Sequence, residues 1–299
     1  MPSWNEVLIE IQNSNRVDAL DFVRRKYLKS LSEKNNRNVI AYYSGWLQKP
    51  RIGNAEICDD DKNGFMATIH KLDRSKGLDL ILHTPGGDIA ATESIVNYLQ
   101  KMFGKDIRAI IPQIAMSAGT MIACSCKEII MGKQSNMGPI DPHFSGIPAH
   151  GVIAEFKRAL VEIKKDPETI PIWQTVVSKY HPTFIGECQN AIEWSEEIVS
   201  SWLETNMFDG VPDAKGKANK VVKNLGSHED TKTHARHIHI EEARNFGLNI
   251  KSLEADFSQD FQDTVLTVHH AFMHTFANSN SIRIIENHLG NAIVFNITS

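Results

Sequence analysis

Two short glycine-containing segments decide the fold of this chain: His83–Asp88, with the sequence HTPGGD, and Ala115–Thr120, with the sequence AMSAGT. Each segment follows an apolar run that predicts a buried strand, and each precedes a stretch that predicts a helix. Repeated strand–loop–helix units are typical of a mainly parallel α/β layer, whose loops meet at the carboxyl ends of the strands. We therefore expect the two segments to lie together at one edge of a sheet.

A serine beside glycine amides is an arrangement that suits acyl transfer. Ser117 precedes a predicted helix, so a negative charge that develops near its hydroxyl lies at the positive end of the helix dipole. Gly86 and Gly87 allow close approach of the backbone, which lets amide groups stabilise an oxyanion. Ser117 is therefore a candidate nucleophile. The competing explanations are that Ser117 only caps the helix and that the glycines only form a turn.

The composition indicates an ordinary globular protein rather than a nucleic-acid or membrane protein. The 299 residues are 41% hydrophobic and 23% charged, which suffices for one sizeable α/β core with additions. The net charge of -4, without a basic stripe interleaved with aromatic residues, argues against nucleic acid as a partner. The uncharged stretch Ala109–Cys126 contains Pro112 and Gly119, so we expect a strand, a turn and a buried helix there and no membrane partner.

The cysteines and the N-terminal sequence favour a cytoplasmic protein without a metal or other cofactor. The cysteines are too few and too scattered for a disulfide framework or a zinc site: Cys58, Cys124, Cys126 and Cys188. Residues Met1–Glu6 lack the basic and apolar regions of a secretory signal. His237 and His239 alternate, but no carboxylate or cysteine stands at ligand spacing beside them.

The order of helical and strand patterns predicts three parts. A helical pattern over residues 1–38 predicts an N-terminal extension, and residues 39–252 hold the alternating strands and helices of the main domain. Residues 253–299 predict a C-terminal extension, made of an amphipathic helix and a possible hairpin. The lysine- and glycine-rich segment at residues 210–233 is expected to be flexible.

Several motifs together resemble a known superfamily. The sequence TPGG at Thr84–Gly87, the serine segment about thirty residues later, and IEEARNFGL at Ile240–Leu248 resemble the Clp protease/crotonase superfamily, in its signal peptide peptidase A branch. GPIDP at Gly138–Pro142 and THARHI at Thr233–Ile238 are similar to the serine dehydrogenase proteinase family. The resemblance covers roughly residues 39–248. It implies a spiral of ββα units, assembly into a homo-oligomer, and hydrolysis of a peptide or protein substrate by a serine.

The resemblance implies a role for each residue that matches these motifs. Ser117 matches the nucleophile of a serine endopeptidase. The backbone amides of Gly87 and Ala118 match the donors of the oxyanion hole. Three flanking residues are candidates for contacts with the substrate: Gly86, Asp88 and Met116.

The motifs leave the general base open, and lysine is the first alternative. Peptidases of the signal peptide peptidase A type use a lysine base. Lys157 and Lys164 lie on the flank of the helix predicted over Ile153–Lys165, and Lys157, at 157 - 117 = 40 residues past Ser117, is nearer the separation in that group. A lysine base must be buried enough to be neutral near pH 7. The competing explanation is a lysine that keeps its amine in solvent.

Histidine is the second alternative. The position of the Clp protease histidine holds Ile140 here, while His143 lies at 143 - 117 = 26 residues past Ser117, in a predicted loop. The position of the Clp aspartate holds His234, Arg236 and His237 instead of a carboxylate. An ordinary Ser-His-Asp triad is therefore in doubt, and His234 becomes a candidate base that approaches from a different side.

Two other functions fit the same motifs. A crotonase-like enzyme would bind an acyl-coenzyme A and use a similar oxyanion hole without a covalent serine, but no basic pocket for the adenine phosphate stands out. A ring-forming scaffold or adaptor would keep the glycines and Ser117 for structure alone, and the undefined base supports this alternative. Reaction with a fluorophosphonate or binding of a coenzyme A thioester distinguishes the three.

Overall fold

A seven-stranded sheet runs through the body of the protein in the order β10-β5-β3-β2-β1-β11-β12. The computed structural model describes residues 3–50, 52–144, 146–226 and 236–297. Neighbouring strands from β10 to β1 run parallel, whereas β11 is antiparallel to both β1 and β12. The strands are β1 (Asn38–Ser44), β2 (Leu78–His83), β3 (Ile107–Ile111), β5 (Glu128–Met131), β10 (Ile250–Ser252), β11 (Ser281–Asn287) and β12 (Ala292–Asn296).

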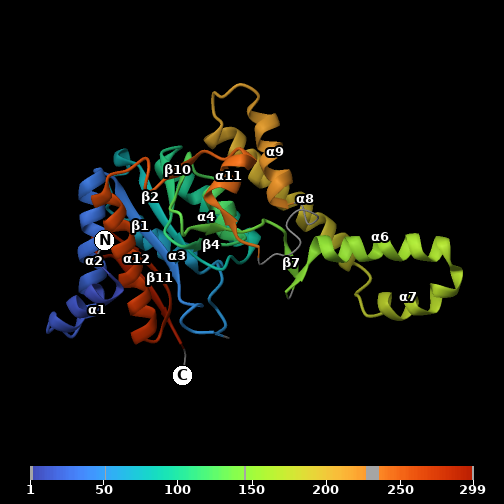
Figure 1. Cartoon of the computed structure of the whole chain (residues 1–299), viewed down its shortest axis with the longest axis horizontal. Helices are drawn as coiled ribbons and strands as arrows, with labels where there is room; N and C mark the ends of the chain where they lie inside the picture. The colour runs from blue at the N-terminus through green and yellow to red at the C-terminus, as the bar shows by residue number, and fades with distance from the viewer. Residues whose placement is uncertain (1–2, 51, 145, 227–235, 298–299) are drawn as a thin grey trace.

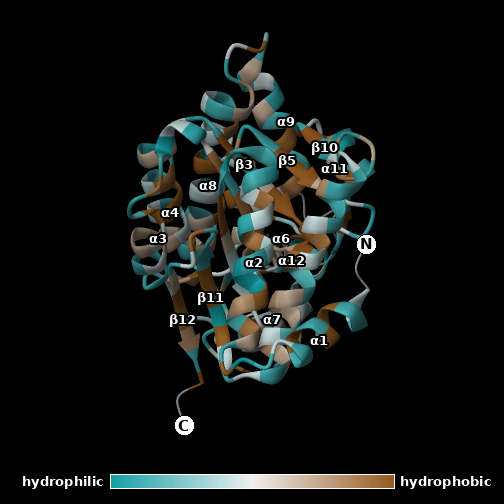
Figure 2. Cartoon of the chain, turned by 90° about the vertical axis from the view of Figure 1, so that its left-hand side faces the viewer, coloured by the Kyte–Doolittle hydropathy of each residue, from teal (hydrophilic) through white to brown (hydrophobic). Residues whose placement is uncertain are grey.

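Helices cover both faces of this sheet, so its strands are apolar on both sides. In β1, Ile40 and Tyr42 face one core and Ala41 and Tyr43 face the other. Figure 2 shows the brown strands enclosed by helices whose outward sides are teal. The first core lies under α3 (Asp61–Ile69), α4 (Ile89–Phe103) and α5 (Ala118–Cys124), and the second under α2 (Ala19–Asn35) and α12 (Gln259–Asn278).

The two ends of the chain pack on each other and on the sheet. The described part of the predicted N-terminal extension holds two helices, α1 (Trp4–Asn13) and α2, and both pack against α12; its last residue, Asn38, begins β1. The predicted C-terminal hairpin is confirmed by the pairing of β11 with β12. Arg24 of α2 reaches Glu286 of β11 in a buried ion pair at 2.8 Å. The division at residues 38 and 252 stays a prediction, since packed elements lie on both sides of each boundary.

A helical arm projects from one side of the body (Figure 1). A two-stranded sheet of β7 (His143–Phe144) and β8 (Ile147–Pro148) leads into it, and it has a small core of its own around Val152 and Cys188. Its helices are α6 (Ala149–Lys165), η2 (Pro167–Thr169), α7 (Ile170–Val177) and α8 (Phe184–Trp202).

The chain returns from the arm to the body through shorter elements. These are the π-helical turn η3 (Leu203–Met207), α9 (Ala214–Gly226), β9 (Ile238–His239) and α11 (Ile240–Phe246). The prediction of a flexible segment is wrong for α9, because Ala218, Val221 and Leu225 are buried on one side of a regular helix. Residues 227–233 of that prediction lie outside the described residues.

The uncharged stretch Ala109–Cys126 contains the strand and the buried helix that the sequence predicts, and a second short strand lies between them. The end of β3, the short strand β4 (Ile114–Ala115) and α5 follow one another there. A second small sheet joins β4 to β6 (Asn136–Met137) and β9, while the 3-10 turn η1 (Arg74–Lys76) leads into β2. Among the described residues, no helix is both long and apolar enough to cross a bilayer.

Candidate active site

The two glycine-containing segments lie side by side, as the sequence predicts. Thr84, just past β2, forms a parallel bridge with Ala115 at the end of β4. The Met116 amide donates to the Thr84 carbonyl at 3.0 Å, and the Thr84 amide donates to the Ile114 carbonyl at 3.2 Å. These bonds hold the start of the Pro-Gly-Gly loop beside the turn that carries Ser117.

Ser117 has a strained backbone conformation at the turn from β4 into α5. Its φ of 50° and ψ of -115° lie outside the regions that residues with a Cβ ordinarily occupy. Such a conformation costs on the order of 1–3 kcal/mol and is concentrated at functional sites. The sharp turn between a strand and a helix that presents a nucleophilic serine in hydrolases has the same strained character. The Ser117 side chain makes no capping hydrogen bond, which removes the capping explanation.

Gly86 lies directly against this turn. A Cβ built on Gly86 would be 2.7 Å from the Ser117 Cβ and 3.1 Å from the Ala118 amide nitrogen. Its φ of +103° also disfavours any other residue. The missing side chain therefore keeps the space beside Ser117 and the Ala118 amide open.

Gly87 is pressed against a second segment of chain. The Ile57 amide donates to the Gly86 carbonyl at 2.8 Å, and the Asp88 amide donates to the Ile57 carbonyl at 2.9 Å. A Cβ on Gly87 would lie 2.3 Å from the Ile57 backbone, which explains why the position is glycine. Among the described residues, the amides of Gly87 and Ala118 donate no hydrogen bond, so both are available to a ligand.

The neighbouring residues support this geometry. The Thr120 hydroxyl donates to the Ala115 carbonyl at 2.9 Å and accepts from the Gly138 amide at 3.0 Å. The Met116 side chain packs on Gly138, where a Cβ would lie 2.6 Å from its terminal methyl group. Asp88 accepts from the Ala91 amide at 2.7 Å and so caps α4. Contacts of Gly86, Asp88 and Met116 with a substrate stay predictions.

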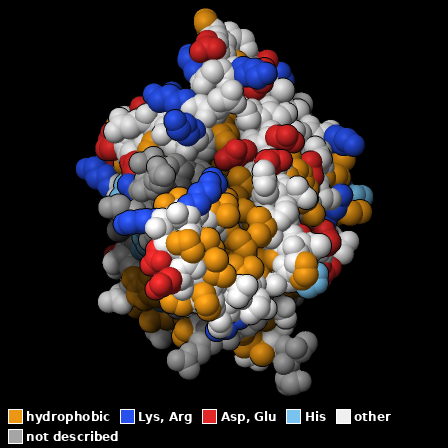
Figure 3. Space-filling model, turned by 90° about the vertical axis from the view of Figure 1, so that its right-hand side faces the viewer, with side chains coloured by type: hydrophobic (Ala, Val, Ile, Leu, Met, Phe, Trp, Pro, Cys, Tyr) orange, Lys and Arg blue, Asp and Glu red, His pale blue; other side chains and the backbone are white. Residues whose placement is uncertain are grey.

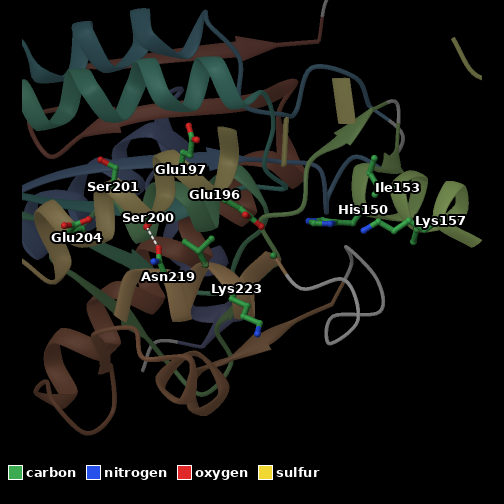
Figure 4. A pocket seen from close by; sticks show the side chains of 13 residues that line it. His150, Ile153, Lys157, Glu196, Glu197, Ser200, Ser201, Glu204, Asn219 and Lys223 are labelled. Atoms are coloured by element: carbon green, nitrogen blue, oxygen red, sulfur yellow. Dashed lines mark hydrogen bonds between the residues drawn. The ribbon is translucent and has the colours of Figure 1, made fainter. Parts of the chain in front are cut away.

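The candidate base Lys157 lies on the arm helix α6 with its side chain exposed, as Lys164 does. It lines a cavity of about 800 Å³ between α6, α8 and α9, together with His150, Glu196 and Lys223 (Figure 4). Of the described residues that line this cavity, none belongs to either glycine segment. The helix phase correctly places Lys157 at the edge of the apolar stripe, but the stripe lines a groove of the arm rather than packing on the body.

A buried carboxylate that sequence reasoning gave no role lies between two histidines. The Asp141 side chain is 2% exposed, and its oxygens lie 3.7 Å from the His143 Nε2 and 3.9 Å from the His150 Nε2. Its position two residues before His143 in the sequence was the available signal. The other predicted base, His234, lies outside the described residues, while Arg236 forms an ion pair with Glu242.

His83 supports the site from behind. It is the last residue of β2, immediately before the Pro-Gly-Gly loop, and it is fully buried. Its ring packs on Trp46 and Tyr43, with ring centroids 4.5 and 5.3 Å apart. Burial, aided by the neighbouring His269, holds the pKa of His83 well below its usual range. His83 is therefore a neutral packing residue at the end of the strand.

The mainly parallel sheet presents Ser117 on a strained turn beside Gly86 and Gly87, an arrangement that suits a serine hydrolase. A family model described as "ClpP-like SDH-type serine proteinase" matches residues 7–262, and the chain belongs to this family. The membership confirms the resemblance and the Clp-like α/β fold predicted from the sequence, and it makes the chain a serine peptidase in the general sense.

Relatives and solved structures give the range of similarity. The chain is 28% identical to "Uncharacterized protein MJ0137" of Methanocaldococcus jannaschii over 236 residues, which are 77% of this chain and 74% of that protein. It is 29% identical to "Uncharacterized protein MJ1495" of the same organism, over 66% of this chain and 59% of that protein. A solved variant of the 1510-N membrane-bound stomatin-specific protease aligns with a TM-score of 0.39 and 15% identity, over 70% of this chain and 79% of that one.

Proposed function

We propose that the chain is a serine endopeptidase that forms an acyl-enzyme on Ser117. The Ser117 Oγ attacks the carbonyl carbon of a peptide bond, and the amides of Gly87 and Ala118 donate hydrogen bonds to the oxyanion. The amine leaves with a proton, and water then hydrolyses the ester. The observation that carries this proposal is the strained backbone of Ser117 against Gly86. A serine kept only for structure gives no reason to retain that strain.

We propose a histidine held by Asp141 as the general base, with His143 as the residue. A lysine acts as a base only when burial makes it neutral, and the Lys157 side chain is exposed. Asp141, by contrast, is a buried carboxylate beside His143, and such a group orients an imidazole and stabilises its charged form. Lys157 and His234 are the alternative bases, and substitution of each candidate in turn distinguishes them from His143.

The test combines a fluorophosphonate probe with the hydrolysis of a fluorogenic peptide library. We expect the folded protein to be labelled and Ser117→Ala to lose all labelling, whereas the exposed control Ser178→Ala keeps it. We expect His143→Ala to lower kcat by about 10³-fold or more, and Lys157→Ala to change it by less than about threefold. Absence of labelling in the folded protein contradicts the hydrolase proposal. If Lys157→Ala or His234→Ala loses activity while His143→Ala keeps it, the substituted residue, and not His143, is the general base.

We also propose that the chain acts as a homo-oligomer, and the arm supports this. Hydrophobic side chains gather on the face that the arm presents in Figure 3. An apolar groove of about 660 Å³ lies there between α6, α7 and α8, and Leu160 and Ile172 beside it are 62% and 65% exposed. Apolar patches of this kind mark interaction sites. Light scattering should show an assembly that Leu160→Glu and Ile172→Glu dissociate; a monomer at all concentrations contradicts the proposal.

The cysteines support a cytoplasmic location, which we propose for the chain. All four are free thiols, and Cys124, Cys126 and Cys188 are buried. Burial raises the pKa of Cys126 to about 12, so this thiol is unreactive while the protein is folded. Unpaired thiols are usual in a reducing compartment. Fractionation of cells that express the chain tests the location, and recovery outside the cytoplasm would contradict it.

A further inference from the structure

A pocket of about 360 Å³ lies between η3, α9 and α11. Four apolar side chains form its floor: Met207, Phe208, Val211 and Phe246. Met207 and Phe208 are almost fully buried. Of the described residues that line this pocket, none belongs to the glycine segments, the Asp141 cluster or the large cavity beside Lys157.

The floor of this pocket is built on an uncommon backbone conformation. Leu203–Met207 form a π-helical turn, closed by the Phe208 amide that donates to the Leu203 carbonyl at 2.8 Å. Single π turns are rare and occur frequently at functional sites. Asn206 fixes this one, because its side-chain amide donates to the Ser125 carbonyl of the body at 2.6 Å. The turn thereby places Met207 and Phe208, which also pack in the main core, in the lining of the pocket.

The rim of the pocket is cationic. Lys217 and Lys220 line it from α9, three residues apart on one side of the helix, and both side chains are exposed. The described lining residues include no carboxylate, and within the described residues neither lysine forms an ion pair. Two ammonium groups above an apolar floor are complementary to a ligand that carries a carboxylate next to an apolar group.

We propose that this pocket binds the C-terminal residue of a peptide whose last side chain is apolar. The side chain inserts over Phe246 and Val211, and the carboxylate lies between the amines of Lys217 and Lys220. Gly247 also lines the pocket, and its φ of +106° disfavours any other residue there. A volume near 360 Å³ suits one large side chain and its carboxylate. The proposal requires no step of the Ser117 chemistry.

Calorimetric titration of the full-length protein tests the site with three probes. N-acetyl-phenylalanine carries both groups, N-acetyl-phenylalaninamide lacks the carboxylate, and octanoate carries the same chemistry from a lipid source. We expect saturable binding of the first probe and at least tenfold weaker binding of the second. The double variant Lys217→Gln/Lys220→Gln should weaken binding of the first probe at least tenfold. The control Lys215→Gln/Lys133→Gln removes the same charge from exposed lysines outside the pocket and should change little.

Three results would overturn the proposal. The first is that N-acetyl-phenylalanine shows no saturable binding. The second is that both double variants weaken its binding equally, which would indicate a general effect of charge. Octanoate that binds at least tenfold more tightly than N-acetyl-phenylalanine would assign the pocket to fatty acids instead. Phe246→Ala, checked for its melting temperature, should weaken all binding and keep the discrimination between acid and amide. Fluorophosphonate labelling of Ser117 should be the same in both double variants, so either proposal can fail without the other.

Discussion

Gly86 leaves no room for a side chain beside Ser117, because a Cβ on Gly86 would lie 2.7 Å from the Ser117 Cβ. We expect Gly86→Ala to push the two segments apart and to strain the backbone at a φ of +103°. The variant should lose at least about 100-fold in kcat/KM, since the change displaces the amides that we propose as oxyanion donors. Its free energy of unfolding should fall by about 1–3 kcal/mol.

The matched control for this change is Gly53→Ala. A Cβ at Gly53 has no heavy atom of the described residues within 4 Å, so the substitution should leave both activity and stability unchanged. Peptide hydrolysis and urea unfolding measure the two effects. Full activity in Gly86→Ala would show that the segments tolerate separation and that the site does not depend on their contact.

The strain at Ser117 predicts that two substitutions of this residue differ in stability. Ser117→Ala removes the proposed nucleophile but keeps a Cβ at a φ of 50°, whereas Ser117→Gly relieves the strain. Relief of the strain stabilises Ser117→Gly, but glycine also loses more backbone entropy on folding than alanine does. The free energy of unfolding of Ser117→Gly should therefore be about 1 kcal/mol higher than that of Ser117→Ala. Neither should react with the fluorophosphonate. Equal stability of the two variants would mean that the turn relaxes without cost.

The buried ion pair between Arg24 and Glu286 should be important for stability. Both side chains are almost completely buried, and Arg24 also donates to the Thr275 hydroxyl at 2.9 Å. We expect Arg24→Met to lower the free energy of unfolding by about 3–5 kcal/mol, because it leaves a buried carboxylate without one of its cations. The exposed ion pair of Lys29 with Glu33 supplies the control. Lys29→Met should change the free energy of unfolding by less than the experimental error. Equal effects would contradict the prediction.

The buried histidines His83 and His269 should make the protein sensitive to acid. Burial and then the charge of His270 lower the pKa of His269 to about 3. In the unfolded chain its pKa is about 6.5, so below that pH the unfolded state binds a proton that the folded state excludes. The stability due to neutral His269 is therefore complete above about pH 6.5 and is lost as the pH falls toward about 3.

Substitution of His269 isolates this contribution. When the pH falls from about 6 to about 4.5, the free energy of unfolding of His269→Phe should fall by ~2 kcal/mol less than that of the unaltered protein. The reason is that one such histidine contributes about 1.4 kcal/mol per pH unit. Urea unfolding across that range measures the difference, and the exposed His181→Phe serves as the control. An unchanged slope in His269→Phe would show that this residue takes up its proton without unfolding.

Local sequence patterns predicted the sheet and the nucleophile loops because both depend on short-range order. Short apolar runs such as Leu80–Leu82 are typical of a strand buried on both faces, and a glycine pair such as Gly86 and Gly87 allows a close backbone contact. The segments therefore lie together as expected. The pairing of β11 with β1 was not predicted, because a strand pattern near residue 284 contains no information about its partner.

The general base was harder to predict, because its position depends on how whole elements are oriented. Helix phase correctly placed Lys157 on the flank of a helix, but phase does not tell whether that helix packs on the body or projects as an arm. Asp141 lies within the Gly138–Pro142 motif, and the motif alone does not indicate a role for it. Its burial beside His143 arises from three-dimensional packing that no local pattern expresses.

The position of β11 between β1 and β12 has a consequence for synthesis of the chain. Ser44 ends the first strand, and the strand that covers its open edge is complete only at Asn287, 287 - 44 = 243 residues later. At translation rates of about 5–20 residues per second, the edge of β1 stays unpaired for roughly 12–50 s while the rest of the chain is synthesised. During this time the nascent chain exposes unpaired amides along an apolar strand, so its yield in the cell should depend on chaperones that shield emerging polypeptides.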